Sequence, residues 1–407
     1  MSSIDWVPEL AARLDALVPL EDSPRADWGD VVARTGRRRQ LRLWRTFPRR
    51  RLRLAIVVAL LFLLLTGAAT ATYLLLRANG DIAVPGRGKL LVFNPNGQRL
   101  HAIASCPAHS PSCAIGSPAW SPAGTRVAFL RGFYGGGNAP SHLFLYVAAA
   151  DGRGMRRLAA CGSCGTQWGE QHIAWSPDGR WIAFTRDTGT RRRRQEALWV
   201  DSAAGGRLHR LTYCHPSCAD VQPAWSPDGH LLAFLHLAPT SSVWHLYTVH
   251  SDGSGLTEIA DGAEPQWSPD GRRIAFDLRK GGIEVADADG SHVHLLIAGK
   301  SPGAPSWSPN GRKLVFFNAP GWPGHYRAEV WTMNADGSHK KRLYRSGCCV
   351  DSWAPPIWSP DGRMIAFSAN SARGTFVINA EGTGLRRLSS IVTDSLSWQA
   401  QPKGKQR

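Results

Sequence analysis

The side chains of this 407-residue chain that most clearly could do chemistry are its eight cysteines. Each lies close to a second cysteine, and each pair falls in a connection between two of the repeated units that make up most of the chain. The fourth of these connections lies apart from the other three. This placement favours a disulfide within each connection. The predicted pairs are Cys106 with Cys113, Cys161 with Cys164, Cys214 with Cys218, and the vicinal pair Cys348 and Cys349.

A zinc site is the alternative for the two middle pairs. Thiolates of Cys161, Cys164, Cys214 and Cys218 from neighbouring connections have a spacing that a tetrahedral Zn²⁺ tolerates. All eight cysteines, however, follow residue 105, in the part of the chain that we expect to be exported to an oxidising compartment. We therefore expect disulfides, with no metal and no cofactor.

Two other patterns resemble reactive sites but lack a required residue. Asp287-x-Asp289-Gly290 looks like the start of a calcium loop, yet the downstream acidic ligand is missing and Asp-Gly suits a hairpin turn. There is no Gly-x-Ser-x-Gly nucleophile elbow, and no histidine cluster or carboxylate pair recurs at a repeated position. We predict no catalytic residue and no enzyme; an active site at the centre of a ring of repeats is the remaining alternative.

Long irregular connections carry the candidate binding residues. Residues 131–142, 186–197 and 318–328, together with the cysteine connections, are rich in arginine and aromatic side chains, which are enriched at binding hot spots. We expect these connections to share one face of the fold. The candidates are Tyr134, Trp168, Arg191, Arg192, Arg193, Arg194, Trp322, Tyr326 and Trp353.

A sixfold repeat must position these connections. IAWSPDGRWIAF (173–184) has five close relatives, which begin at Pro118, Pro223, Pro265, Pro305 and Pro356. Each reads as a short strand ending in Trp, a Pro-Asp-Gly turn and a strand that is apolar on both faces. A second motif such as HLYTVHSDGSGLTEIA (245–260) adds a strand, an Asp-Gly turn and another strand. One repeat is therefore a four-stranded antiparallel meander.

A sheet with two apolar faces must have both faces covered. Sheets arranged radially around an axis cover the faces of their neighbours, so the repeats predict an all-β fold, a β-propeller. Six complete units run from 118 to 390, and fragments remain at 89–104 and 396–402. We expect these fragments to form a composite closing blade of three strands, which gives seven blades. Six blades with a loose N-terminal hairpin are the alternative.

The WSPDG-x-x-IAF phrase and the hairpin that follows it resemble the TolB-type propeller repeats, which are also found in the propeller of prolyl-oligopeptidase-like enzymes. The resemblance covers residues 89–400 and implies the propeller fold. It leaves function open, because this fold serves binding proteins, scaffolds and enzyme accessory domains alike. We expect no hydrolase domain like that of the oligopeptidase-like enzymes, because the sequence ends at Arg407 with the ring barely closed.

An uncharged run at residues 54–76 predicts a transmembrane helix, because about 20 apolar residues cross a bilayer. Nine arginines and no acidic residue lie in 37–53, so the positive-inside rule places the N-terminus in the cytoplasm. A cleaved signal peptide is the alternative, but its apolar core would be shorter and nearer the N-terminus. The predicted layout is an Arg-rich cytoplasmic tail (1–53), the helix (54–76), a linker (77–88), the propeller (89–402) and a tail (403–407).

These observations predict a single-pass protein of the cytoplasmic membrane whose propeller lies outside the cytoplasm. The propeller would be a binding module for a protein, a peptide or an anionic envelope polymer. The formal net charge of +17 fits an anionic partner. We expect no nucleic acid, because an Arg run beside a span is a topology signal. The alternative function is a transmembrane sensor with residues 1–36 as its cytoplasmic output.

Overall fold

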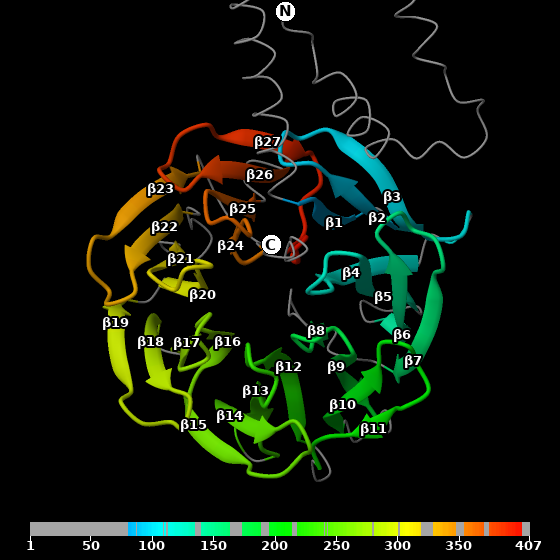
Figure 1. The fold of residues 1–407 in the computed structure, drawn as a ribbon, viewed down its shortest axis with the longest axis horizontal. Coiled ribbons are helices and arrows are strands. Elements are labelled where there is room, and N and C mark those ends of the chain that lie inside the picture. Colours follow the sequence, from blue (N-terminus) through cyan, green and yellow to red (C-terminus); the bar gives the residue numbers. More distant parts are fainter. Residues whose placement is uncertain are drawn as a thin grey trace, which may run out of the picture. The chain divides into compact units, whose positions relative to one another are not determined.

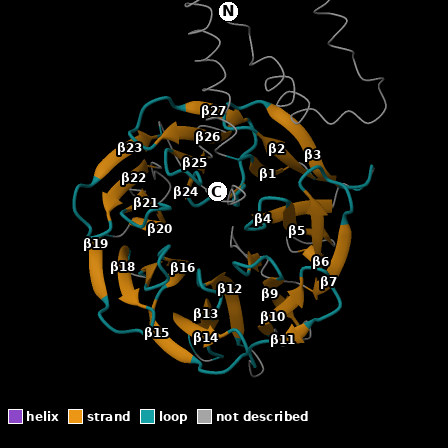
Figure 2. Cartoon of the chain, viewed as in Figure 1, coloured by secondary structure: helices purple, strands orange, loops and turns teal. Residues whose placement is uncertain are grey.

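The computed structural model describes residues 80–400, apart from 87, 109, 111–112, 135–139, 163–172, 189–194, 214–217, 240, 242, 279–280, 300–301, 319–328, 347–353 and 370–373. Strands, turns and loops make up the described residues, and none of them is helical (Figure 2). This part of the chain accordingly has no helix with the length and apolar character to span a bilayer. The predicted helix 54–76 and both predicted tails lie outside the described residues.

Four of the repeats each form a separate four-stranded antiparallel sheet, with the strands in chain order. The first strand of each sheet lies nearest the centre of a ring and the fourth lies at its rim (Figure 1). Their bounds are β4 (Cys113–Trp120), β5 (Arg126–Tyr134), β6 (Pro140–Ala149) and β7 (Arg156–Gly162); β16 (Ala263–Trp267), β17 (Arg273–Asp277), β18 (Gly282–Asp287) and β19 (His294–Ala298); β20 (Pro302–Trp307), β21 (Lys313–Asn318), β22 (Glu329–Asn334) and β23 (Lys341–Arg345); and β24 (Ile357–Trp358), β25 (Met364–Ala369), β26 (Gly374–Asn379) and β27 (Arg386–Ser389).

Two further repeats are joined into one eight-stranded sheet. The connection is a parallel pairing of Glu196 in β10 with Ala219 in β12. The outermost strand of the first repeat, β11, has only two residues. The bounds are β8 (Ile173–Trp175), β9 (Trp181–Asp187), β10 (Glu196–Ser202) and β11 (His209–Arg210), followed by β12 (Ala219–Trp225), β13 (Leu231–Leu237), β14 (Trp244–His250) and β15 (Thr257–Asp261).

Strands from both ends of the chain form a composite sheet, as the sequence predicts, but it has four strands instead of three. Its order is β28 (Ser397–Trp398), β1 (Ile82–Gly86), β2 (Lys89–Phe93) and β3 (Arg99–Ser105). Ile82 pairs with both Phe93 and Trp398. The prediction of a linker over 77–88 is wrong for residues 82–86, which form β1. Its apolar residues are fully buried, Ile82 and Val84 in the core on one face of the sheet and Ala83 in the core on the other. The propeller therefore begins before residue 89.

The Ser-Pro-Asp-Gly turn is held by the same hydrogen bonds in successive repeats. In the β12–β13 turn, the Ser226 hydroxyl donates to Oδ1 of Asp228 at 2.6 Å and accepts from the backbone N–H of Leu231 at 2.9 Å. Gly229 has a positive φ of 77°, and a Cβ there would lie 3.5 Å from Cδ of Pro177 in the preceding turn. The serine, proline, aspartate and glycine thus fix each turn and stack it on its neighbour.

The core lies between adjacent sheets. The second strand of each repeat is buried on both faces; in β9, Ile182, Ala183 and Phe184 are all fully buried. Phe184 packs with residues of the preceding repeat, whereas Ala183 packs with residues of the following one. Each sheet therefore contributes to two interfaces, which explains why the second strand of the repeat has no polar side.

The repeated tryptophan also joins neighbouring sheets through its indole. In four repeats the Nε1–H donates to a backbone carbonyl at the inner strand of the preceding repeat. Trp120 and Trp225 differ, because their buried Nε1 atoms have no acceptor among the described residues. The donors and acceptors are Trp175 to Ala119 (2.9 Å), Trp267 to Ala224 (3.0 Å), Trp307 to Gln266 (3.1 Å) and Trp358 to Ser306 (3.1 Å).

Candidate functional site

The predicted binding residues fall on segments that the structure does not describe. Tyr134 is the last residue of β5, and its side chain lies outside the described part of the structure. The other candidates, Trp168, Arg191–Arg194, Trp322, Tyr326 and Trp353, lie outside the described residues. The binding face predicted from them stays a prediction.

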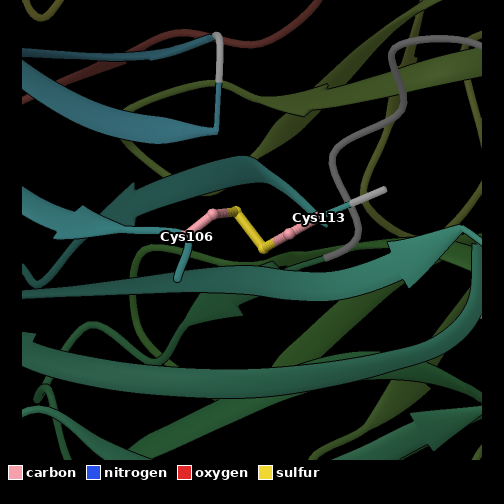
Figure 3. The surroundings of a disulfide bond; sticks show 2 residues. All are labelled: Cys106 and Cys113. Carbon is pink, nitrogen blue, oxygen red and sulfur yellow. A yellow bond between two sulfur atoms is a disulfide. The ribbon is translucent and has the colours of Figure 1, made fainter. Parts of the chain in front are cut away.

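One of the predicted disulfides is present. Cys106 and Cys113 are bonded, with their Cα atoms 5.8 Å apart, and the bond connects the end of β3 to the start of β4 (Figure 3). Cys218 is also disulfide-bonded, so it cannot serve as the thiolate ligand that the zinc alternative requires. The other predicted disulfide cysteines, Cys164, Cys214, Cys348 and Cys349, lie outside the described residues.

Cys161 differs from its prediction, because it is a free thiol in the structure and not a disulfide partner. It lies in β7 and is fully buried in the apolar core between the first two repeats. Burial raises the pKa of the Cys161 thiol to about 12, since the thiolate would lose its hydration there. At neutral pH this cysteine is therefore a small apolar core residue.

The junction of the β8–β11 and β12–β15 repeats is the candidate site that the described residues support best. At this junction the buried Nε1 of Trp225 has no acceptor among the described residues. A cavity of about 370 Å³ opens beside it, lined by Trp181, Trp225, His209 and turn residues of both repeats. We call it the turn-side cavity. A smaller cavity of about 200 Å³ adjoins Trp120, but no charged side chain lines it.

Three acidic residues line the turn-side cavity, and all three are exposed, so they lie at its mouth: Asp178, Asp228 and Asp252. The backbone N–H of His230 and the hydroxyl of Ser226 both donate hydrogen bonds to Asp228, and these bonds lower its pKa. Hydrogen bonds from the hydroxyl and the backbone N–H of Ser254 lower the pKa of Asp252.

The third carboxylate belongs to Asp178. Desolvation acts to raise its pKa, but hydrogen bonds from the Ser176 hydroxyl and the Arg180 N–H outweigh it, so this pKa is lowered too. All three carboxylates are therefore negatively charged at neutral pH.

The aromatic side chains of this cavity complement its charge. Trp181 and His209 meet edge to face, with their ring centroids 5.9 Å apart. Trp181 and Trp225 are both half-buried, and both line the cavity. Indole faces attract cations, and desolvated cation–π contacts contribute up to about 2 kcal/mol each. A cavity lined by two tryptophans and three ionised aspartates suits a lysine or arginine side chain.

A second cavity of about 250 Å³ lies at the same junction, toward the rim. Leu211, Phe234 and Val249 supply apolar walls, and Asp220 and His236 supply a polar one. Nδ1 of His236 lies 2.7 Å from Oδ1 of Asp220. The carboxylate fixes the imidazole so that Nε2 is left for another partner. This rim cavity can therefore accept an apolar group that carries a hydrogen-bonding end.

Sequence reasoning missed both cavities. Asp178 and Asp228 are turn residues in the sequence, identical in pattern to Asp270 and Asp361, which line neither cavity. What distinguishes the junction is the two-residue strand β11 and the pairing of β10 with β12. In the sequence, residues 202–219 depart from the repeat pattern, and this departure could have indicated the irregular junction.

Comparison with known proteins agrees with this fold. Residues 190–355 match the family model of the TolB beta propeller domain, which confirms the resemblance of the repeats to TolB-type propellers. A search of curated proteins finds no match to the chain.

Solved structures with a similar fold include a protein of unknown function from Desulfotomaculum acetoxidans. Its TM-score is 0.53 at 14% identity, over 79% of this chain and 99% of that one. A prolyl endopeptidase also has a TM-score of 0.53 at 14% identity, over 79% of this chain and 52% of that one. TolB from Agrobacterium tumefaciens has a TM-score of 0.48 at 21% identity, over 70% of this chain and 95% of that one. At these identities the likeness shows the fold alone.

Proposed function

We propose that this chain is a membrane-tethered, extracytoplasmic β-propeller that binds a partner protein through a basic segment of that partner. The observation that carries the proposal is the turn-side cavity, which is lined by Trp181 and Trp225 together with Asp178, Asp228 and Asp252. A TolB-like propeller suggests a protein-binding module, and aromatic pockets with complementary charge are typical binding hot spots.

A guanidinium or ammonium group suits the cavity better than an anionic polymer does. The chain as a whole carries +17, yet the mouth of this cavity carries three carboxylates that turn hydrogen bonds keep ionised. An incoming arginine would pair with carboxylates at the mouth and stack on indole within it. An anionic envelope polymer would be repelled at this position.

The tether and the orientation belong to the same proposal. Support comes from the uncharged run 54–76, the nine arginines of 37–53 and the restriction of cysteines to the chain after residue 105. A ring of seven blades is also part of the proposal, with the eight-stranded sheet counted as two blades.

The chain offers a matched set of variants to test the binding site. Asp178→Asn and Asp228→Asn together remove two charges and keep the turns, because Asn310 occupies the same turn position in the β20–β21 repeat. There its Oδ1 accepts from the Ser308 hydroxyl at 2.9 Å and from the Arg312 N–H at 3.1 Å. Asp270→Asn with Asp361→Asn is the control, since it makes the same change in turns that do not line the cavity.

The experiment is capture of envelope proteins on the full-length chain, compared among wild type, the site variant and the control variant. We expect the same proteins on the wild type and the control, and their loss from the site variant. Equal retention on all three would remove the turn-side cavity from the proposal. Stronger retention on the site variant would instead indicate an anionic partner at this cavity, because neutralised carboxylates no longer repel it.

A further inference from the structure

Three potential metal ligands meet on the outer strands of the β12–β15 repeat. Nδ1 of His245 lies 3.1 Å from Oε1 of Glu258 and 2.8 Å from Oδ1 of Asp261. Ligand atoms of the three side chains all lie within 4.8 Å of one another. His245 is in β14, and the two acids are in and at the end of β15.

A β-bulge brings the two acids to the same face. The pairing of β14 with β15 shifts between Leu246 and Tyr247, which leaves Ile259 as an extra residue in β15. Side chains alternate along an unbroken strand, so residues three apart would face opposite sides. The bulge cancels this alternation, and Glu258 and Asp261 both face His245. The ligand set thus rests on paired backbone and not on a loop.

In the β20–β23 repeat, the three corresponding positions hold one acid and two arginines, whose charges are paired with one another. The same bulge in the β22–β23 pair places Glu329 opposite Arg345 and close to Arg342. Both arginines contact Oε1 of Glu329 at 3.3 Å. The β14–β15 pair has two carboxylates and one imidazole instead. Among the described residues, neither Glu258 nor Asp261 forms an ion pair with a lysine or an arginine.

We propose that His245, Glu258 and Asp261 hold a divalent transition-metal ion. One imidazole nitrogen and two carboxylate oxygens form a mixed ligand set that suits Zn²⁺ and its first-row neighbours. Two carboxylates and a neutral imidazole balance the charge of a divalent ion. The metal takes the place of the proton that His245 Nδ1 shares with the carboxylates. Glu258 and Asp261 are 52% and 65% exposed, so the ion keeps open positions for water.

Tyr247 supports this ligand set from outside. Its hydroxyl donates to Oε2 of Glu258 at 2.8 Å, which leaves Oε1 directed toward His245. Hydrogen bonds of this kind orient carboxylate ligands, and losing one weakens metal binding about 10- to 100-fold. Tyr247 is thus a positioning residue of the site.

The test measures Zn²⁺ binding to the full-length chain, freed of any affinity tag and stripped of metal, by competition with a chromophoric chelator. We expect one Zn²⁺ per wild-type chain. His245→Gln and Asp261→Asn should weaken it more than about tenfold, and Tyr247→Phe about 10- to 100-fold. Unfolding of each metal-free variant, measured alongside, shows whether the substitution has left the fold intact.

The matched control is Asp287→Asn. Asp287 Oδ2 lies 2.8 Å from Nδ1 of His292, so this pair repeats the histidine–carboxylate contact without a second carboxylate. We expect this variant to bind Zn²⁺ like the wild type. A wild type that binds no Zn²⁺ overturns the proposal without any variant. Equal loss in Asp287→Asn, or Ca²⁺ that competes as well as Zn²⁺, also overturns it, because neither result requires the His245 nitrogen.

Discussion

His236 and Asp220 face each other across β13 and β12, with Nδ1 of the histidine 2.7 Å from Oδ1 of the aspartate. The other carboxylate oxygen of Asp220 accepts a 2.5 Å hydrogen bond from the hydroxyl of Thr212. Thr212 follows β11 and belongs to the preceding repeat. The pair is therefore part of a polar link across the junction where both cavities lie.

The stability of the propeller should depend on pH through this pair. The hydrogen bond to Asp220 outweighs burial and raises the pKa of His236. The protonated histidine thus stabilises the fold fully below its unfolded pKa of about 6.5, and this contribution is lost as pH rises through the higher folded pKa. Urea unfolding between pH 5.5 and about 9 should show a smaller decline for His236→Gln than for wild type. Identical pH dependences would contradict the assigned pKa direction.

Replacement of Glu264 by glutamine should stabilise the protein at alkaline pH. Burial in β16 raises the pKa of Glu264 to about 7, so the folded state holds its proton more tightly than the unfolded state does. The free energy of unfolding therefore falls as pH rises from about 4.5 to about 7. At pH 8, Glu264→Gln should gain on the order of 1–3 kcal/mol, with little change at pH 4. Glu381→Gln, at an exposed turn, is the control; a loss of stability at pH 8 in Glu264→Gln would refute the prediction.

The indole hydrogen bonds between sheets predict a difference between two tryptophan variants. Trp267→Phe removes the 3.0 Å bond from Nε1 to the carbonyl of Ala224, whereas Trp225→Phe removes no such bond. Trp267 is 9% exposed and Trp225 is half-buried, so Trp267→Phe also loses at least as much buried apolar area. We expect Trp267→Phe to be less stable than Trp225→Phe by about 0.5–1.5 kcal/mol in chemical denaturation. An equal or reversed order would mean that these bonds do not join the sheets.

The proposed orientation predicts which thiols react from outside the cell. Cys106 and Cys113 are bonded, so an impermeant maleimide should label them in intact cells only after mild reduction. Cys161 should stay unlabelled in the folded chain, because it is fully buried and its pKa is raised to about 12. Mass spectrometry of the labelled peptides distinguishes the sites. Labelling of Cys106 and Cys113 only after cell lysis would place the propeller in the cytoplasm.

The repeated turn explains why the fold could be predicted from sequence. Ser226, Asp228 and Gly229 each have a local role in one turn, and the Ser and the Gly recur in all six copies, which indicated six similar hairpins. Strand β1 was missed because Ile82–Gly86 is short and includes proline and glycine. Its pairing partner Trp398 lies at the other end of the chain, and no local pattern indicates such a contact.

The candidate site could not be predicted in the same way. Asp178 and Asp228 have the same sequence context as the turn residues Asp270 and Asp361, and only the geometry of the junction places them around a cavity. His245 and Asp261 meet across two strands because of a bulge at Ile259, which changes the face on which acids appear. Such sites depend on register and on irregular pairing, which composition and periodicity do not reveal.

The central claim is that Trp181, Trp225 and the acids around them bind a cationic side chain. The most direct measurement is the ¹⁹F NMR spectrum of the full-length chain labelled with 5-fluorotryptophan, with Trp181→Phe and Trp225→Phe assigning the two resonances. The peptide acetyl-Gly-Arg-Gly-amide should shift both resonances in the wild type, and its neutral citrulline counterpart should not. In the Asp178→Asn, Asp228→Asn variant neither peptide should shift them. Equal shifts with arginine and citrulline, or arginine shifts that survive in this variant, would contradict the claim.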